Sequence, residues 1–169
     1  AIQASLTGHL VFSTLHTNDS AGSVTRLVDM GIEPFLISSS VIGMMAQRLV
    51  RTLCSVCKEP VVPTDLELSQ LGYTREQFLQ ESTGVVYKGR GCSECRGDGY
   101  RGRTGIYELL VVDDEIRALI MANVDSNSIK KKAIIKGMLT LRDDGTRKVF
   151  SGETSIAEVL RVTQDDLLS

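Results

Sequence analysis

The 169-residue sequence lacks several features that would each indicate a class of function. Its formal net charge is only −2, so it has no overall positive charge to attract nucleic acid. Its uncharged, largely apolar stretch 35–47 is shorter than the roughly 20 residues that a membrane-spanning helix needs. No charged and then apolar leader stands at the N-terminus. We therefore expect an intracellular chain that has no transmembrane segment and binds no nucleic acid.

A complete phosphate-binding loop is also missing. Gly84-x-x-x-x-Gly89 is followed by Arg90 and Gly91, where such a loop requires Lys and then Ser or Thr. The pattern Gly97-x-Gly99-x-x-Gly102 matches a dinucleotide fingerprint, but it follows a cysteine pair instead of a strand. We interpret it as a tight turn. No nucleophile–base arrangement can be assembled from the sequence spacing, and paired acids such as Asp113 and Asp114 are typical of helix N-termini.

Four cysteines are present, and they form two identical Cys-x-x-Cys pairs: Cys54 with Cys57, and Cys92 with Cys95. Two pairs of this spacing can surround one Zn²⁺ ion tetrahedrally, so we predict a structural zinc site. Disulfides, redox dithiols and buried thiols are the alternatives. Disulfides require an oxidising compartment, and a redox Cys-x-x-Cys normally occurs once after a strand. The long separation of the pairs predicts an insertion between them.

A free-standing zinc ribbon that binds nucleic acid or unfolded protein is an alternative of another class. The run 88–103 contains five basic and two acidic residues, a charge of +3 (5 − 2). Four thiolates with one Zn²⁺ would reduce this to about +1, which attracts phosphate weakly. Tyr100 is the one aromatic ring in the glycine-rich turn, too few for base stacking. The second cysteine pair also resembles the zinc knuckles of Hsp40-type chaperones.

Mixed helix and strand patterns predict an α/β chain. The apolar run 9–15 predicts a strand buried on both faces, and 16–20 forms a polar cluster after it. A helix should follow, capped by Asp19 or Ser20 and ended by Gly31. Apolar spacing predicts a second helix from Pro34 to Leu53. Further patterns predict weak helix or loop at 65–80, strands at 85–87 and 105–111, and helices starting near 113, 126, 141 and 155.

Two of these later segments predict which side chains are exposed and which are buried. Residues 130–132 are lysines and are expected on the outer face of their helix, with Ile134 on the inner face. Phe78 and Leu79 of the insertion are expected to be exposed and are candidates for a docking surface.

His16, Thr17 and Asn18 are candidates for a ligand site because they follow a predicted strand and precede a helix. In open α/β sheets, ligands bind beyond the carboxyl ends of strands and near helix N-termini. His16 could bind a phosphate or orient a water molecule. Alternatively, His16 and Asn18 simply close a turn, and His9 at the start of the strand has a structural role.

The combination of several stretches resembles the ATPases that drive type II secretion and type IV pilus assembly, also called general secretion pathway protein E. The similarity covers nearly the whole chain, and the segment from about 61 to 88 is the least similar part. The resembling stretches are the histidine box with the residues before it (3–18), and 31–40, 46–54, 99–110 and 154–163.

This resemblance implies the C-terminal part of a RecA-like ATPase core with an inserted tetracysteine zinc module and a helical C-terminal subdomain. The implied domains are 1–53 for the core, 54–104 for the zinc module and 105–169 for the strand return and helices. His16 would lie near the γ-phosphate, with His9, Thr17 and Asn18 as further nucleotide-binding residues. Assembly and secretion members carry the four cysteines and retraction motors lack them.

The resemblance further implies a cytoplasmic homo-hexamer that hydrolyses ATP with Mg²⁺ and acts through an inner-membrane secretion platform. In the family, the phosphate-binding loop and the Walker B strand precede the histidine box. This sequence begins with Ala1, not Met, and we expect it to be a piece of a longer protein. We predict an inactive fragment of an active ATPase. The sequence favours the secretion branch, with type IV pilus assembly as the alternative.

Overall fold

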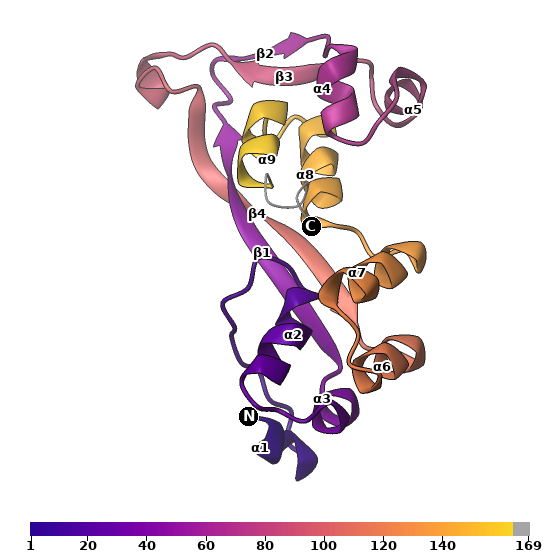
Figure 1. Ribbon diagram of the computed structural model, residues 1–169. Coiled ribbons are helices and arrows are strands. Elements are labelled where there is room, and N and C mark those ends of the chain that lie inside the picture. The colour runs from indigo at the N-terminus through magenta and orange to yellow at the C-terminus, as the bar shows by residue number, and fades with distance from the viewer. Residues whose placement is uncertain (164–169) are drawn as a thin grey trace. The chain divides into compact units, whose positions relative to one another are not determined.

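The computed structural model describes residues 1–163 and shows a mixed α/β chain (Figure 1). Its contacts group into two units, 1–46 with 108–140, and 47–107 with the residues from 141 onward. The elements in chain order are α1 Ile2–Leu6, α2 Gly22–Asp29, α3 Pro34–Ser40, β1 Gly43–Leu53, β2 Lys58–Val61, α4 Asp65–Gln70, α5 Arg75–Glu81, β3 Val86–Gly89, the 3₁₀ turn η1 Ser93–Cys95, β4 Tyr100–Val111, α6 Asp114–Met121, α7 Ser126–Ile135, α8 Leu141–Phe150 and α9 Ile156–Val162.

The first unit packs α2, α3, α6 and α7 around one apolar core. As the sequence predicts, the Asp19 carboxylate accepts a hydrogen bond from the first amide of α2, and Gly31 adopts a left-handed φ of +81° after the helix. Asp113 likewise caps α6 by accepting from the Ile116 amide. The core side chains are Ala21, Val24, Ile37, Met44, Leu110, Val112, Ile116, Ile120, Ile129 and Ala133.

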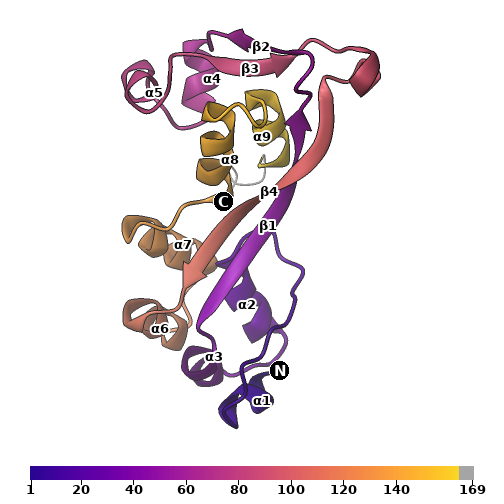
Figure 2. The same cartoon turned by 180° about the vertical axis from the view of Figure 1, so that it is seen from behind.

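The second unit contains the insertion, the cysteines and the last two helices. The strands β2 and β3 pair antiparallel, with Lys58 opposite Gly89 and Val61 opposite Val86 (Figure 2). Helices α4 and α5 each begin with a capping box, at Thr64 and Thr74 respectively. They share a core with α8 and α9, made by Leu68, Leu71, Phe78, Val86, Val149, Ile156 and Val159.

Strands β1 and β4 form a second two-stranded sheet, and each strand contributes residues to both units. The alternating burial of β1 shows why it is extended: Met44, Ala46 and Val50 are buried, while Met45 and Leu49 are exposed. Period-two burial is the signature of a strand with one face on a core. β1 ends at Leu53, directly before Cys54 of the first cysteine pair.

The predicted helix from Pro34 to Leu53 is therefore wrong beyond Ser40. Its apolar residues fitted a helical spacing, but the same residues also alternate, and short apolar patterns cannot separate the two. The hydroxyls of Ser38 and Ser40 donate back to carbonyl groups of the preceding turn, and Val41 is already extended with ψ of 128°. The chain leaves the helix at this serine run and becomes β1.

The strand predicted at 9–15 is also absent: these residues have no regular secondary structure, and Leu10 and Phe12 are 72% and 89% exposed. A strand exists only where a neighbouring backbone supplies hydrogen bonds. Within residues 1–163, no strand pairs with this segment.

Three smaller expectations about burial are wrong. Lys130 is buried, Ile134 is 43% exposed, and Phe78 is completely buried, whereas Leu79 is exposed as expected. Lys130 turns inward because its ammonium group meets a carboxylate, which the helical pattern could not show. Helices α6 to α9 start where the sequence predicts. No helix among residues 1–163 is long and apolar enough to cross a membrane.

Candidate functional site

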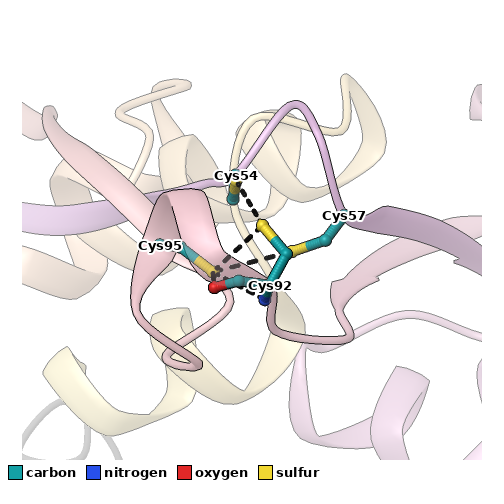
Figure 3. A group of neighbouring side chains, drawn as sticks. All are labelled: Cys54, Cys57, Cys92 and Cys95. Carbon is teal, nitrogen blue, oxygen red and sulfur yellow. Dashed lines mark hydrogen bonds between the residues drawn. The ribbon is translucent and has the colours of Figure 1, made fainter.

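The four cysteines converge in the second unit (Figure 3). Cys54 directly follows β1 and Cys57 directly precedes β2, whereas Cys92 directly precedes the turn η1 and Cys95 is its last residue. In each pair the chain reverses within a few residues: the Cys57 and Lys58 amides donate to the Cys54 carbonyl, and the Gly97 amide donates to the Cys92 carbonyl. These turns direct all four sulfurs into one small volume.

The sulfur positions fit a tetrahedral metal ion. The Sγ–Sγ distances are 3.9 Å for Cys54–Cys92, 3.8 Å for Cys57–Cys95 and 3.7 Å for Cys92–Cys95, and all four sulfurs lie within 4.8 Å of one another. A regular tetrahedron with Zn–S bonds of about 2.3 Å has edges of about 3.8 Å. Three of the residues are buried and all four cysteines are free, so the disulfide alternative does not apply to this structure.

Backbone amides around the sulfurs favour thiolates. The Cys95 sulfur accepts hydrogen bonds from the Cys92 and Gly99 amides, both at 3.2 Å. Burial opposes ionisation of Cys95, but these N–H donors outweigh it and lower the pKa of the thiol to about 6. Burial raises the pKa of Cys57 to about 12. A bound divalent ion would favour the ionised form of its ligands, since metals bind the thiolate.

Glycines let the two cysteine segments approach each other. A Cβ at Gly89 would lie 2.3 Å from the Gly99 carbonyl oxygen, and one at Gly91 would lie 2.6 Å from that of Gly97. Gly91, Gly97 and Gly99 also have positive φ angles. Of the three fingerprint-like glycines, Gly97 and Gly99 therefore serve the turn as predicted, whereas Gly102 lies within β4. A closed four-cysteine site leaves no position for substrate, so its role would be structural.

An ion-pair cluster next to the cysteines was missed by sequence reasoning. The Glu158 carboxylate, 0% exposed, accepts from the Arg51 side chain at 2.8 Å and the Arg161 side chain at 2.7 Å. Arg51 also pairs with Asp98 of the cysteine turn and stacks on Tyr100. Burial would raise the pKa of Glu158, but the hydrogen bonds from Arg161 and Arg51 outweigh it and lower the pKa to about 2. The cluster ties α9 to the turn that carries Cys95.

The histidine-containing segment lies in the first unit and is separate in sequence from the cysteines. His16 and Asn18 are exposed, and Thr17 is half-buried, with its hydroxyl 2.9 Å from that of Ser23 in α2. His9 is exposed, with Nδ1 3.0 Å from the Thr7 hydroxyl. His16 to Asn18 thus lie in the turn just before α2, as predicted, although the strand before them is missing.

The family described as Type II/IV secretion system protein matches residues 1–161. The chain belongs to this family. Its fold is accordingly an α/β ATPase-type fold that carries a tetracysteine cluster.

Named secretion and pilus proteins are close relatives of this family member. It is 52% identical over 166 residues to type II secretion system protein E of Pseudomonas aeruginosa, and 52% identical over 165 residues to type II secretion system ATPase E of Vibrio cholerae. It is also 52% identical over 163 residues to the type IV pilus assembly ATPase PilB of Thermus thermophilus. These alignments cover 98%, 98% and 96% of the chain, but only 32%, 32% and 18% of the relatives.

Solved structures support the fold of this secretion-family chain. The pilus retraction motor PilT with bound ADP aligns with a TM-score of 0.60 at 20% identity, covering 99% of this chain and 36% of PilT. The Legionella pneumophila ATPase DotB aligns with a TM-score of 0.57 at 21% identity, covering 97% of this chain and 34% of DotB. At such low identity the similarity concerns the fold.

Proposed function

We propose that this chain is the C-terminal part of a hexameric, RecA-like motor ATPase that powers type II protein secretion through pseudopilus assembly. The match of residues 1–161 to the secretion family carries the proposal, together with the identity to secretion ATPases. The chain spans about a third or less of these relatives, so hydrolysis of ATP with Mg²⁺ is proposed for the full-length protein. The proposed location is the cytoplasm, at an inner-membrane secretion platform.

Type IV pilus assembly is the second candidate function. The identity to PilB of Thermus thermophilus equals that to the two secretion proteins, so overall similarity does not separate the branches. Deletion of the gene in its host would separate them. Loss of exported proteins from the medium with intact pili supports the secretion branch, whereas loss of surface pili with normal export supports pilus assembly.

The proposed roles of the site residues follow the two features described above. His16 would contact the γ-phosphate or the attacking water, and His9, Thr17 and Asn18 would contribute to nucleotide binding. The anchoring of Thr17 to Ser23 supports this, since it fixes the turn that bears the exposed His16. Cys54, Cys57, Cys92 and Cys95 would hold one structural Zn²⁺, which the sulfur distances support.

ATP hydrolysis by the purified full-length protein tests the function. We expect His16→Ala to lower kcat by about 100-fold, the scale at which loss of one transition-state hydrogen bond acts. Leu79→Ala, an exposed change in the other unit, serves as the control and should retain full activity. Equal kcat for His16→Ala and the control would refute the role of His16, and a full-length protein without magnesium-dependent ATPase activity would refute the function itself.

A further inference from the structure

Two residues far along the chain hold the end of the histidine-containing turn. The Glu108 Oε1 atom, on β4, accepts hydrogen bonds from both the backbone amide of Ser20 at 2.9 Å and its hydroxyl at 2.5 Å. Glu108 lies 88 residues from Ser20 in sequence, and both residues belong to the first unit. Ser20 thus has both its donors committed to a single carboxylate oxygen.

The neighbouring Asp19 is held from α7. Its Oδ2 atom lies 2.9 Å from the Lys130 ammonium group, and the two side chains are only 16% and 10% exposed. Its Oδ1 atom accepts from the Gly22 amide at 2.7 Å. Both carboxylate oxygens of Asp19 therefore have partners, one on α2 and one on α7, and these contacts help to fix the geometry of the turn.

Burial of the Glu108 carboxylate is energetically unfavourable if the residue serves packing alone. It is 0% exposed, forms no ion pair within the described part of the chain, and its Oε2 atom has no hydrogen-bond partner there. Burying a carboxylate without full compensation costs free energy, and a well-packed apolar residue would usually stabilise the site better. What Glu108 provides that an apolar residue cannot is the acceptor for the two Ser20 donors.

We propose that Glu108 is a positioning residue: by holding Ser20 against β4, it fixes the adjoining turn that presents His16 and Asn18 to the nucleotide. This inference rests on the proposed function of His16. Glu108 acts through Ser20 and itself contacts no reacting atom. Because misplacement of a catalytic group by about 1 Å can cost about 100-fold in rate, such an anchor matters for turnover even where binding persists.

Paired substitutions in the full-length protein test the proposal. Glu108→Ala removes the acceptor, whereas Glu108→Gln keeps an oxygen that can accept from Ser20. Val112→Ala is the matched control, because Val112 is 3% exposed in the same unit, and its loss weakens the core without touching the Ser20 contacts. His16→Ala reports independently on the proposed function. Steady-state ATPase kinetics and hydrogen exchange of the segment 9–23 are measured for each variant.

We expect Glu108→Ala to lower kcat by about 10- to 100-fold, with KM for ATP changed by less than about 3-fold, and to speed exchange in 9–23. Glu108→Gln should restore kcat to within about 3-fold of the unmodified protein. Val112→Ala should leave kcat and the exchange of 9–23 unchanged.

Two outcomes would overturn the proposal, and a third concerns the function on which it rests. If Glu108→Ala matches Val112→Ala in kcat and exchange, or if Glu108→Gln is as impaired as Glu108→Ala, Glu108 does not position the turn through Ser20. If His16→Ala leaves kcat unchanged while Glu108→Ala speeds exchange in 9–23, the anchor exists but the role of His16 is refuted. Should Glu108→Ala fail to fold, Ser20→Ala removes one donor and should give the same kinetic effect in weaker form.

Discussion

Because Gly89 has no side chain, its backbone can approach the segment of the second cysteine pair closely. This close approach at Gly89 is called the crossing below. An alanine Cβ at this position would lie 2.3 Å from the Gly99 carbonyl oxygen, so the backbone would have to move. The Gly99 amide also donates to the Cys95 sulfur, which links the crossing to a metal ligand. Backbone movement here should therefore act on the metal site directly.

We expect Gly89→Ala to lower zinc affinity by about 10- to 100-fold, the range typical of disturbing groups that orient metal ligands. Competition against a chromophoric chelator measures this affinity. Gly72→Ala is the control: its φ of +83° makes alanine unfavourable by about 1 kcal/mol, but nothing lies within 4 Å of the added Cβ. Equal zinc affinity of the two variants would show that the crossing does not set the metal geometry.

Glu158 should make stability depend on pH in the acid range. Its pKa of about 2 lies below the usual 4.5, so its stabilising contribution is complete above about pH 4.5 and is lost as the pH falls towards 2. We expect Glu158→Gln to destabilise the protein by about 1–3 kcal/mol at pH 7, the cost of weakening hydrogen bonds to charged groups. The difference between the thermal unfolding midpoints of the variant and the unmodified protein should shrink below about pH 4.5 and should vanish only as the pH approaches about 2.

The variant and the unmodified protein must be compared at each pH, because the thiolates of the proposed zinc site would also protonate in acid and metal loss would affect both proteins alike. Glu76→Gln, an exposed carboxylate of α5, is the control and should differ little from the unmodified protein at either pH. A penalty for Glu158→Gln that is the same at pH 7 and pH 3 would contradict the lowered pKa of Glu158.

At the scale of elements, local patterns predicted helices better than strands. The helices α6, α7 and α9 have capping residues in their own sequence, and α6 to α9 all start where the local pattern predicts. The segment 9–15 has strand-like residues, but a strand also depends on a neighbour that its own sequence cannot specify. The helix prediction for 34–53 was wrong for a related reason: the apolar residues of this segment fit both the helical period and the strand period.

The cysteine cluster was predictable from the sequence, whereas the long-range contacts of Arg51 and of Ser20 were not. Two Cys-x-x-Cys pairs predict a metal site from residue type and spacing alone. The contact of Arg51 with Glu158 joins residues 107 positions apart, and that of Ser20 with Glu108 joins residues 88 positions apart. Because each of these residues also fits a role in its own helix, strand or turn, the sequence gives no sign of the distant partner. The spacing of Ser155 and Glu158, for example, fits a capping box, but the Glu158 carboxylate binds two arginines instead.

Metal removal should loosen the elements of the second unit unequally. Cys54, Cys57, Cys92 and Cys95 form a small cluster of their own, whereas α4, α5 and β3 share an apolar core with α8 and α9. We expect chelation to raise hydrogen exchange strongly in 54–57 and 90–99, because metal binding to such sites contributes about 10–16 kcal/mol to folding. Exchange in α4 and α5 should change much less.

Cys95→Ser should reproduce the effect of the chelator on both segments, and added zinc should not reverse it. The exposed Ser93→Ala, within the same turn, keeps all four sulfurs and provides the control. Unchanged hydrogen exchange in 54–57 and 90–99 after complete zinc removal would show that backbone hydrogen bonds alone stabilise these two cysteine-containing turns.

At the scale of the whole molecule, the chain combines the turn that we propose to contact a nucleotide with a unit that carries a four-cysteine cluster, but its sequence lacks a phosphate-binding loop. Phosphoryl transfer depends on groups that cradle the phosphates and hold Mg²⁺. We therefore expect the purified 169-residue chain to show no magnesium-dependent ATP hydrolysis, and we expect the full-length protein to hydrolyse ATP. Zinc content and circular dichroism would first establish that the isolated chain is folded, so that inactivity reflects missing groups. Turnover by the folded chain that disappears in His16→Ala would contradict the prediction and would place the complete catalytic machinery within these residues.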